Sequence, residues 1–202
     1  MNVVLYGDSN TYGYDPIKGR IEKRYSNILK EYFDNKINIY EEGLVGRTTI
    51  YDGIRPNVNA LNNVDITLSK YNNIDLFVIM LGTNDLKFSN AKNEKELKKG
   101  LSLLISKILE LNIIKKILII SPILLSSDIE NLDKEYNYNS YLLSKNMSNV
   151  YKEISNDFNT LFLDAKEYAK AGLDGEHLDE QSHKNLGLAI AKIIEDYGNN
   201  KI

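Results

Sequence analysis

The sequence of 202 residues contains no cysteine and only two histidines, His177 and His183. Without cysteine the chain can form neither disulfides nor thiolate metal sites, and it has no cysteine nucleophile. Two histidines, which are not spaced as a pair of ligands on one helix, make no convincing metal cluster. We therefore expect no metal and no other cofactor, and any histidine base must be one of these two.

Further absences bear on location and partners. The first residues, Met1–Tyr6, lack the charged region and long apolar stretch of a signal peptide, and no segment is apolar enough to cross a bilayer. We expect a cytoplasmic protein without a membrane partner. The formal net charge is only −3, and the lysines are spread along the chain instead of forming one basic patch. A nucleic-acid partner is therefore not expected.

The composition that remains is typical of one globular domain. Apolar residues make up 43% of the chain and charged residues 26%. No internal repeat, low-complexity tract or linker divides the sequence, and its length allows one core and one pocket. We expect a single domain over residues 1–202.

Apolar runs of strand length alternate with segments of helical period, which predicts an α/β domain with a parallel sheet. The expected strands are Val3–Tyr6, Ile37–Tyr40, Leu76–Leu81, Ile117–Ser121 and Thr160–Leu163. The expected helices span about Ser26–Phe33, Val58–Lys70, Asn93–Leu111, Glu135–Phe158 and Glu180–Tyr197, and the third begins with a capping-box pattern of Asn93 and Glu96. In the strand order 2-1-3-4-5, strands one and three are neighbours, so the loops that follow them share one rim of the sheet.

A candidate nucleophile, Ser9, lies directly after the first strand in Gly7-Asp8-Ser9-Asn10. Gly7 permits a tight turn, and Asp8 has a short acceptor side chain that suits it to fixing the local backbone. All four residue types also form ordinary turns, so this segment alone would not indicate catalysis.

Asp174 stands three residues before His177, close enough for its carboxylate to reach an imidazole nitrogen. Such a contact would fix the histidine tautomer and stabilise the imidazolium that forms when the ring accepts a serine proton. We expect the Ser9 hydroxyl to lie roughly 2.6–3.2 Å from the other ring nitrogen. For His183, on the last helix, a structural hydrogen bond near the helix start is the stronger interpretation.

Acyl transfer also needs hydrogen-bond donors for the developing oxyanion. Gly46 could supply a backbone N–H, Asn84 a side-chain amide and Ser9 its own N–H. A plain glycine turn and an Asx turn would explain the first two in isolation, but their coincidence with Ser9 and the Asp174/His177 pair favours a site.

In these residues the chain resembles the SGNH (GDSL-like) hydrolase superfamily, whose four blocks occur here in order over nearly the whole length. The resemblance implies that Ser9 is the nucleophile, Gly46 and Asn84 are oxyanion donors with Ser9, His177 is the general base, and Asp174 orients it. It also implies a three-layer α/β/α, flavodoxin-like fold with a five-stranded parallel sheet.

Longer segments are similar to the arylesterase/acyltransferase branch of that superfamily; they are Gly7–Pro16, Arg24-Tyr25, Glu42–Thr49 and Met80–Lys87. This branch usually has tryptophan at the positions of Tyr12 and Tyr25, which bears on the shape of the acyl pocket. Arg47 and Lys87 lie in the matched segments without a catalytic role that the sequence can assign. Members of the branch are often homo-oligomers, so the resemblance implies that this chain can be one too.

The expected activity is hydrolysis of short-chain esters of the aryl or sugar acetate type through an acyl-enzyme, with acyl transfer where an alcohol replaces water. The expected partner is a small-molecule ester. A thioesterase or lysophospholipase would use the same residues but needs an apolar groove, whereas the loops here are polar and rich in tyrosine. A non-catalytic carbohydrate-binding relative and a metal-dependent phosphoesterase are further alternatives, and the intact set of polar residues and the shortage of metal ligands argue against them.

Overall fold

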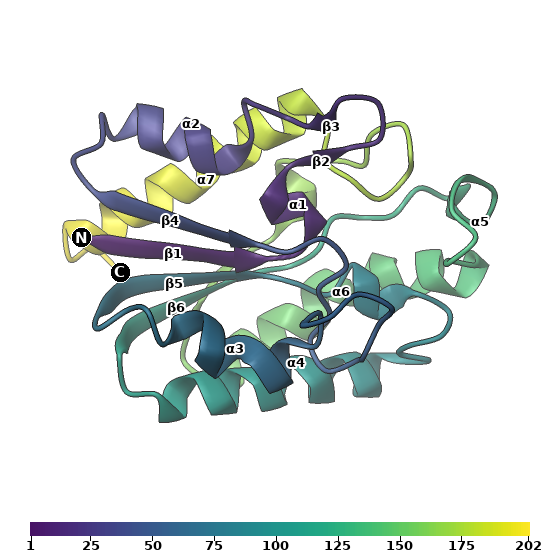
Figure 1. Ribbon diagram of the computed structural model, residues 1–202, viewed down its shortest axis with the longest axis horizontal. Coiled ribbons are helices and arrows are strands. Elements are labelled where there is room, and N and C mark those ends of the chain that lie inside the picture. Colours follow the sequence, from purple (N-terminus) through teal and green to yellow (C-terminus); the bar gives the residue numbers. More distant parts are fainter.

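A parallel sheet of five strands forms the centre of the computed structural model, which describes residues 1–202 (Figure 1). The strands are β1 (Asn2–Gly7), β4 (Asn38–Gly43), β5 (Ile74–Met80), β6 (Ile114–Ile120) and β7 (Leu161–Leu163). They lie in the order β4-β1-β5-β6-β7, and every neighbouring pair is parallel. This is the predicted order 2-1-3-4-5, renumbered because a small hairpin contributes β2 (Tyr14–Asp15) and β3 (Gly19–Arg20). The fold prediction is confirmed.

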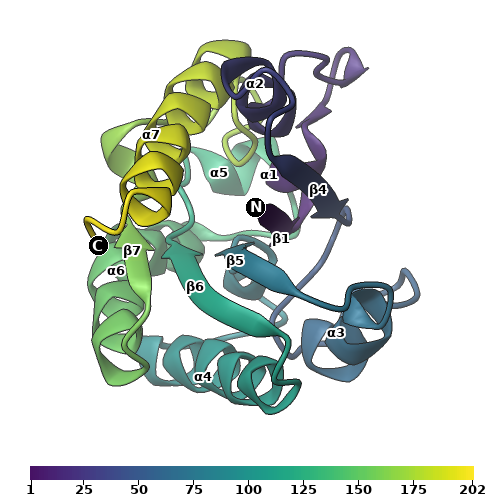
Figure 2. The same cartoon turned by 90° about the vertical axis from the view of Figure 1, so that its left-hand side faces the viewer.

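Helices cover both faces of the sheet, which gives the three layers expected of this fold (Figure 2). One face is covered by α2 (Tyr25–Tyr32) and α7 (Glu180–Gly198), and the other by α3 (Ala60–Leu68), α4 (Glu94–Glu110) and α6 (Tyr138–Asp157). Successive side chains of a strand point to opposite faces. In β1, Val3 and Leu5 therefore belong to the core beneath α2 and α7, while Val4 and Tyr6 belong to the core on the other side.

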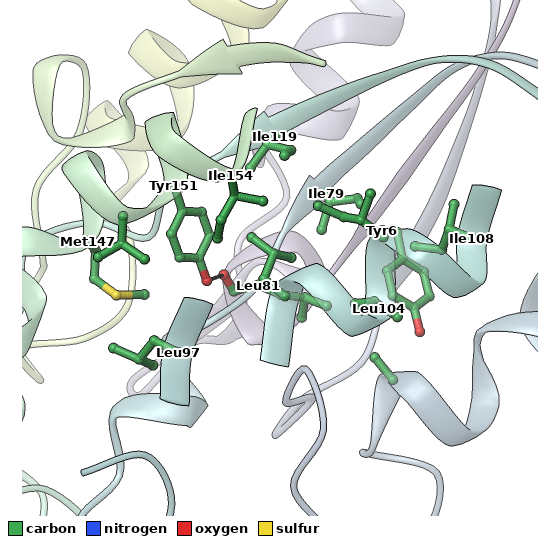
Figure 3. Close-up of a cluster of buried hydrophobic side chains, with 14 of the residues drawn as sticks. Tyr6, Ile79, Leu81, Leu97, Leu104, Ile108, Ile119, Met147, Tyr151 and Ile154 are labelled. Carbon is green, nitrogen blue, oxygen red and sulfur yellow. Dashed lines mark hydrogen bonds between the residues drawn. The ribbon is translucent and has the colours of Figure 1, made fainter. Parts of the chain in front are cut away.

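The larger of the two cores extends to the loop that follows β5. Tyr151 of α6 is buried in it, and its hydroxyl donates a 2.7 Å hydrogen bond to the carbonyl of Leu81 (Figure 3). Burial of a tyrosine usually requires such a partner for its hydroxyl. The bond ties the chain just before Asn84 to the packed interior.

Helix boundaries differ from the predicted ones by a few residues, mainly where polar side chains cap the first turn. Asn59 accepts a hydrogen bond from the Asn62 N–H, so α3 begins at Ala60 and not at Val58. Asn137 and Ser140 form a capping box, so the helix predicted from Glu135 begins at Tyr138. Asn93 caps α4 as predicted, but the Glu96 carboxylate accepts from the Lys92 N–H and not from the N–H of Asn93.

Several short elements had no signal in the sequence, because one turn of helix contains no period of apolar residues. They are α1 (Ser9–Tyr12), α5 (Ile129–Leu132), the 3₁₀ turns η1 (Asn84–Leu86) and η2 (Ala165–Glu167), and the β2–β3 hairpin. In Figure 1 the hairpin, α1 and α5 lie towards the end of the sheet opposite to the two chain termini. No helix has the combined length and apolar character that a membrane span requires.

Candidate active site

The site is built at the carboxyl ends of β1, β4 and β5, where open parallel sheets bind ligands. Ser9 is the first residue of α1, directly beyond β1. Asp8 caps this short helix, because its carboxylate accepts a 2.9 Å hydrogen bond from the Asn10 N–H. A side chain at Gly7 would place its Cβ 1.8 Å from the Thr11 hydroxyl oxygen, so only glycine allows the turn to close.

Ser9, His177 and Asp174 form one hydrogen-bonded chain. The Ser9 Oγ lies 2.8 Å from His177 Nε2, and His177 Nδ1 lies 2.7 Å from Asp174 Oδ2. The Ser9–His177 distance is within the range expected from the sequence. Ser9 is only 3% exposed and His177 only 8%, so water screens this chain of hydrogen bonds weakly.

The electrostatics of the pair favour a carboxylate next to a histidine that can accept a proton. Burial opposes ionisation of Asp174, but the hydrogen bonds from the His177 ring and N–H outweigh it and hold the pKa of Asp174 below its usual value. Burial likewise disfavours the charged form of His177, yet Asp174 and Glu176 raise the pKa of His177 above its usual value. The imidazolium is therefore stabilised, as acyl transfer requires.

Gly46 and Asn84 line the same cavity as Ser9 and His177. Gly46 has a φ of 84°, which glycine adopts without strain, and its N–H has no acceptor within the chain. The Asn84 Nδ2 donates a 3.1 Å hydrogen bond to the Arg47 carbonyl, which fixes the amide and leaves its second N–H for another acceptor. The structure thus brings together all five residues that the sequence singled out.

Arg47, for which the sequence predicts no role, supports the turn that contains Gly46. Its guanidinium donates to the Gly7 carbonyl at 2.7 Å and to the Glu42 carbonyl, and it lies 4.0 Å from the centre of the Tyr6 ring. These contacts join the turn to the ends of β1 and β4. Arg47 is therefore a structural support and does not line the cavity.

Glu176 is a cavity residue that sequence reasoning missed, although it lies between the two recognised residues in Asp174-Gly175-Glu176-His177. Its Oε2 accepts a 2.6 Å hydrogen bond from the Tyr136 hydroxyl, and its Oε1 lies 3.8 Å from His177 Nδ1. Burial raises the pKa of Glu176 to about 7. A second carboxylate that titrates near neutral pH thus faces the histidine.

His183 and the two tyrosines at tryptophan positions lie outside the cavity lining. His183 is fully buried on α7, where its Nδ1 accepts from the Tyr25 N–H at 3.4 Å, and burial lowers its pKa to about 4. Tyr25 is a core residue whose hydroxyl donates to Thr11, and Tyr12 packs beneath the Arg20 guanidinium. Tyr12 and Tyr25 therefore do not line this cavity.

The cavity has a volume of about 780 Å³, and only four of its seventeen lining residues are hydrophobic. Its outer part carries charges of both signs, among them Lys87 and Glu135, whose charged groups are 2.6 Å apart. Its few apolar side chains include Val45, Ile54 and Val58. No group of three or more histidine, aspartate or glutamate side chains is placed to hold a metal ion.

The arrangement agrees with a comparison against protein-family models. The model of the GDSL-like lipases and acylhydrolases matches residues 3–190. The chain belongs to this family. As a member of this family, the protein is a carboxylic ester hydrolase of the SGNH type.

Solved structures of two esterases illustrate the likeness of this GDSL-family chain to its relatives. Est24, a carbohydrate acetylesterase from Sinorhizobium meliloti, is 27% identical with a TM-score of 0.87, covering 96% of this chain and 98% of its own. The native aryl esterase of M. smegmatis is 25% identical, also with a TM-score of 0.87, covering 97% of this chain and 99% of its own. Comparison with curated protein sequences gives no significant match.

Proposed function

We propose that this protein is a serine esterase that hydrolyses short-chain carboxylic esters of the aryl or sugar acetate type. The observation that carries the proposal is the hydrogen-bonded chain from Ser9 through His177 to Asp174, at the wall of a polar cavity that Gly46 and Asn84 also line. The two related esterases support the substrate class, since one is an aryl esterase and the other a carbohydrate acetylesterase.

In the first half of the reaction, the Ser9 Oγ attacks the ester carbonyl carbon while its proton passes to His177 Nε2. The developing oxyanion accepts hydrogen bonds from the N–H groups of Gly46 and Ser9 and from the Asn84 amide. The bond to the alcohol then breaks, the alcohol leaves with the proton from Nε2, and the acyl group stays on Ser9.

In the second half, His177 Nε2 takes a proton from water, and the resulting hydroxide adds to the acyl carbon. The acid leaves as the bond to Ser9 breaks, and the proton on Nε2 returns to the Ser9 oxygen. Asp174 stays ionised throughout and holds the ring in place. An alcohol in place of water would yield a new ester, which we propose as a side activity.

The thioesterase and lysophospholipase alternative finds little support in the cavity. Long acyl chains need a continuous apolar groove, whereas only four of the seventeen residues that line this cavity are hydrophobic. We therefore place the short-chain esterase ahead of it.

The test is a series of p-nitrophenyl esters from acetate to octanoate, assayed with and without a chelator, together with labelling by a fluorophosphonate. We expect the fastest turnover with acetate, no effect of the chelator, and a covalent adduct that mass spectrometry maps to Ser9. Turnover that the chelator abolishes and the fluorophosphonate spares would contradict the serine mechanism. Faster turnover of octanoate would contradict only the short-chain preference.

A further inference from the structure

Asn10, the residue that follows Ser9, contacts the loop that carries His177. Its side chain is almost completely buried, and its amide makes two hydrogen bonds to the main chain of that loop. The Asn10 Nδ2 donates to the Glu176 carbonyl at 3.2 Å, and the Leu178 N–H donates to the Asn10 Oδ1 at 2.8 Å. One amide therefore binds the main chain on both sides of His177.

The Asp174–His177 pair alone does not determine where the imidazole lies relative to Ser9. Asp174 Oδ1 accepts hydrogen bonds from the N–H groups of Glu176 and His177, at 3.3 and 3.0 Å, while its Oδ2 contacts the ring. All these bonds lie within one short segment of chain. They orient the ring within its own loop, and the loop could move as a unit without breaking them.

Other contacts attach this loop to different parts of the molecule. The Gly175 carbonyl accepts from the Ser126 N–H at 2.8 Å, and the Glu176 side chain accepts from Tyr136. Apart from the Ser9–His177 bond itself, the two bonds of Asn10 are the hydrogen bonds that join α1 to residues 174–178. Asn10 is thus the link between the segment of the serine and the segment of the histidine.

We propose that Asn10 is a positioning residue that holds the His177 imidazole at hydrogen-bonding distance from the Ser9 hydroxyl. The inference rests on the proposed esterase function. Displacement of a catalytic group by about 1 Å can cost roughly a hundredfold in rate. A leucine at this position would leave the Glu176 carbonyl and the Leu178 N–H without their partner, and the loop would then settle away from Ser9.

The first test compares Asn10→Leu with Tyr25→Phe, a matched control that loosens α1 on its other side. The Tyr25 hydroxyl donates a 2.7 Å hydrogen bond to Thr11 in the same short helix, but it makes no hydrogen bond with residues 174–178. We expect Asn10→Leu to lower kcat for p-nitrophenyl acetate by about ten- to a hundredfold with KM within about twofold. Inactivation by a fluorophosphonate should slow by the same factor. Tyr25→Phe should keep kcat near that of the wild type even where its melting temperature falls as much as that of Asn10→Leu.

A second readout separates positioning from a general loss of structure. With only two histidines, their proton signals in NMR spectra can be assigned with one variant. We expect the His177 pKa of Asn10→Leu to stay within about half a unit of the wild-type pKa, because the bonds to Asp174 remain. Should Asn10→Leu not fold, Asn10→Asp keeps the size and the acceptor for Leu178 but loses the donor to Glu176. It should show the same fall in kcat, to a smaller degree.

A wild-type kcat in the folded Asn10 variant, or an equal loss in Tyr25→Phe, would overturn the inference while the wild type still hydrolyses the ester. A wild type that neither hydrolyses the ester nor reacts at Ser9 would overturn the proposed function, and this inference with it.

Discussion

The Asp85 carboxylate accepts hydrogen bonds from both the backbone N–H and the hydroxyl of Thr49. The N–H lies 3.1 Å from Oδ1 and 3.0 Å from Oδ2, and the hydroxyl contacts Oδ1. Asp85 directly follows Asn84, and Thr49 lies three residues beyond Gly46. The contact therefore joins the two loops that carry the proposed oxyanion donors.

Asp85→Ala should lower both stability and activity. Loss of the carboxylate leaves the buried Thr49 groups without partners, so we expect the free energy of unfolding in urea to fall by about 1–3 kcal/mol. We also expect kcat to fall by about tenfold or more as the two loops separate. The control is Asn93→Ala, which removes the cap of α4 at a cost of about 1 kcal/mol but should keep kcat. An unchanged kcat in Asp85→Ala would show that the loops hold their places without this contact.

Ser9→Ala and His177→Ala should each lower kcat by at least about a thousandfold, and the double variant should be hardly worse than either, because the residues act as a unit. His183→Ala removes a buried core side chain, so it should cost stability but keep most turnover when assayed well below its melting temperature. Circular dichroism would establish folding before each assay. A greater loss of kcat in His183→Ala than in His177→Ala would reverse our assignment of the base.

Most of the architecture could be predicted from the sequence because the buried strands are unmistakable. Continuous apolar runs such as Leu76–Leu81 are typical of strands covered on both faces. Asp174 and His177 were identified by their three-residue spacing, by the presence of only two histidines and by the resemblance to SGNH hydrolases. The features that could be predicted are those that depend on residues close together in the sequence.

The supporting contacts could not be predicted, because they join residues far apart in sequence. Thr49 and Asp85 are 36 positions apart, and Arg47 and Gly7 are 40 positions apart. The burial of Tyr25 likewise follows from the packing of α2 against α7, which no local pattern reveals. Such long-range contacts depend on the tertiary arrangement and have no signature in a single sequence.

The pH dependence of activity should respond to Glu176. Burial disfavours the charged form of His177, while Asp174 and then Glu176 raise its pKa, so turnover should rise with pH as the ring becomes neutral. Glu176→Gln removes the negative charge that Glu176 gains beside the ring as pH rises through about 7. We therefore expect the acidic limb of the kcat/KM profile to move to lower pH by a fraction of a unit. A shift to higher pH would show that Glu176 does not stabilise the imidazolium.

Glu176 should also make stability depend on pH. Burial raises the pKa of Glu176 from an ordinary value of 4.5 to about 7, so folding favours its protonated form. The stability that comes from the protonated form is fully present below pH 4.5 and is lost as pH rises through about 7. As pH rises between those limits, the free energy of unfolding of Glu176→Gln, measured in urea, should exceed that of the wild type by up to about 3 kcal/mol. A difference that does not change with pH would contradict the raised pKa.

The proposed oxyanion donors can be tested apart from the loops that hold them. Asn84→Ala removes the amide that lines the cavity, and loss of one such donor typically lowers kcat by about a hundred- to a thousandfold with little change in KM. Asn90→Ala is the matched control, because the Asn90 amide donates a 2.8 Å hydrogen bond to the Asn84 carbonyl and so supports the same turn.

If Asn84 acts only through the shape of this turn, the two variants should lose similar activity. We expect Asn90→Ala to lose less than about tenfold, because the Asn84 side chain stays fixed by the Arg47 carbonyl. Equal losses of kcat in steady-state assays of the two variants would show that Asn84 is not an oxyanion donor. Such a result would leave the roles of Ser9, His177 and Asp174 unaffected.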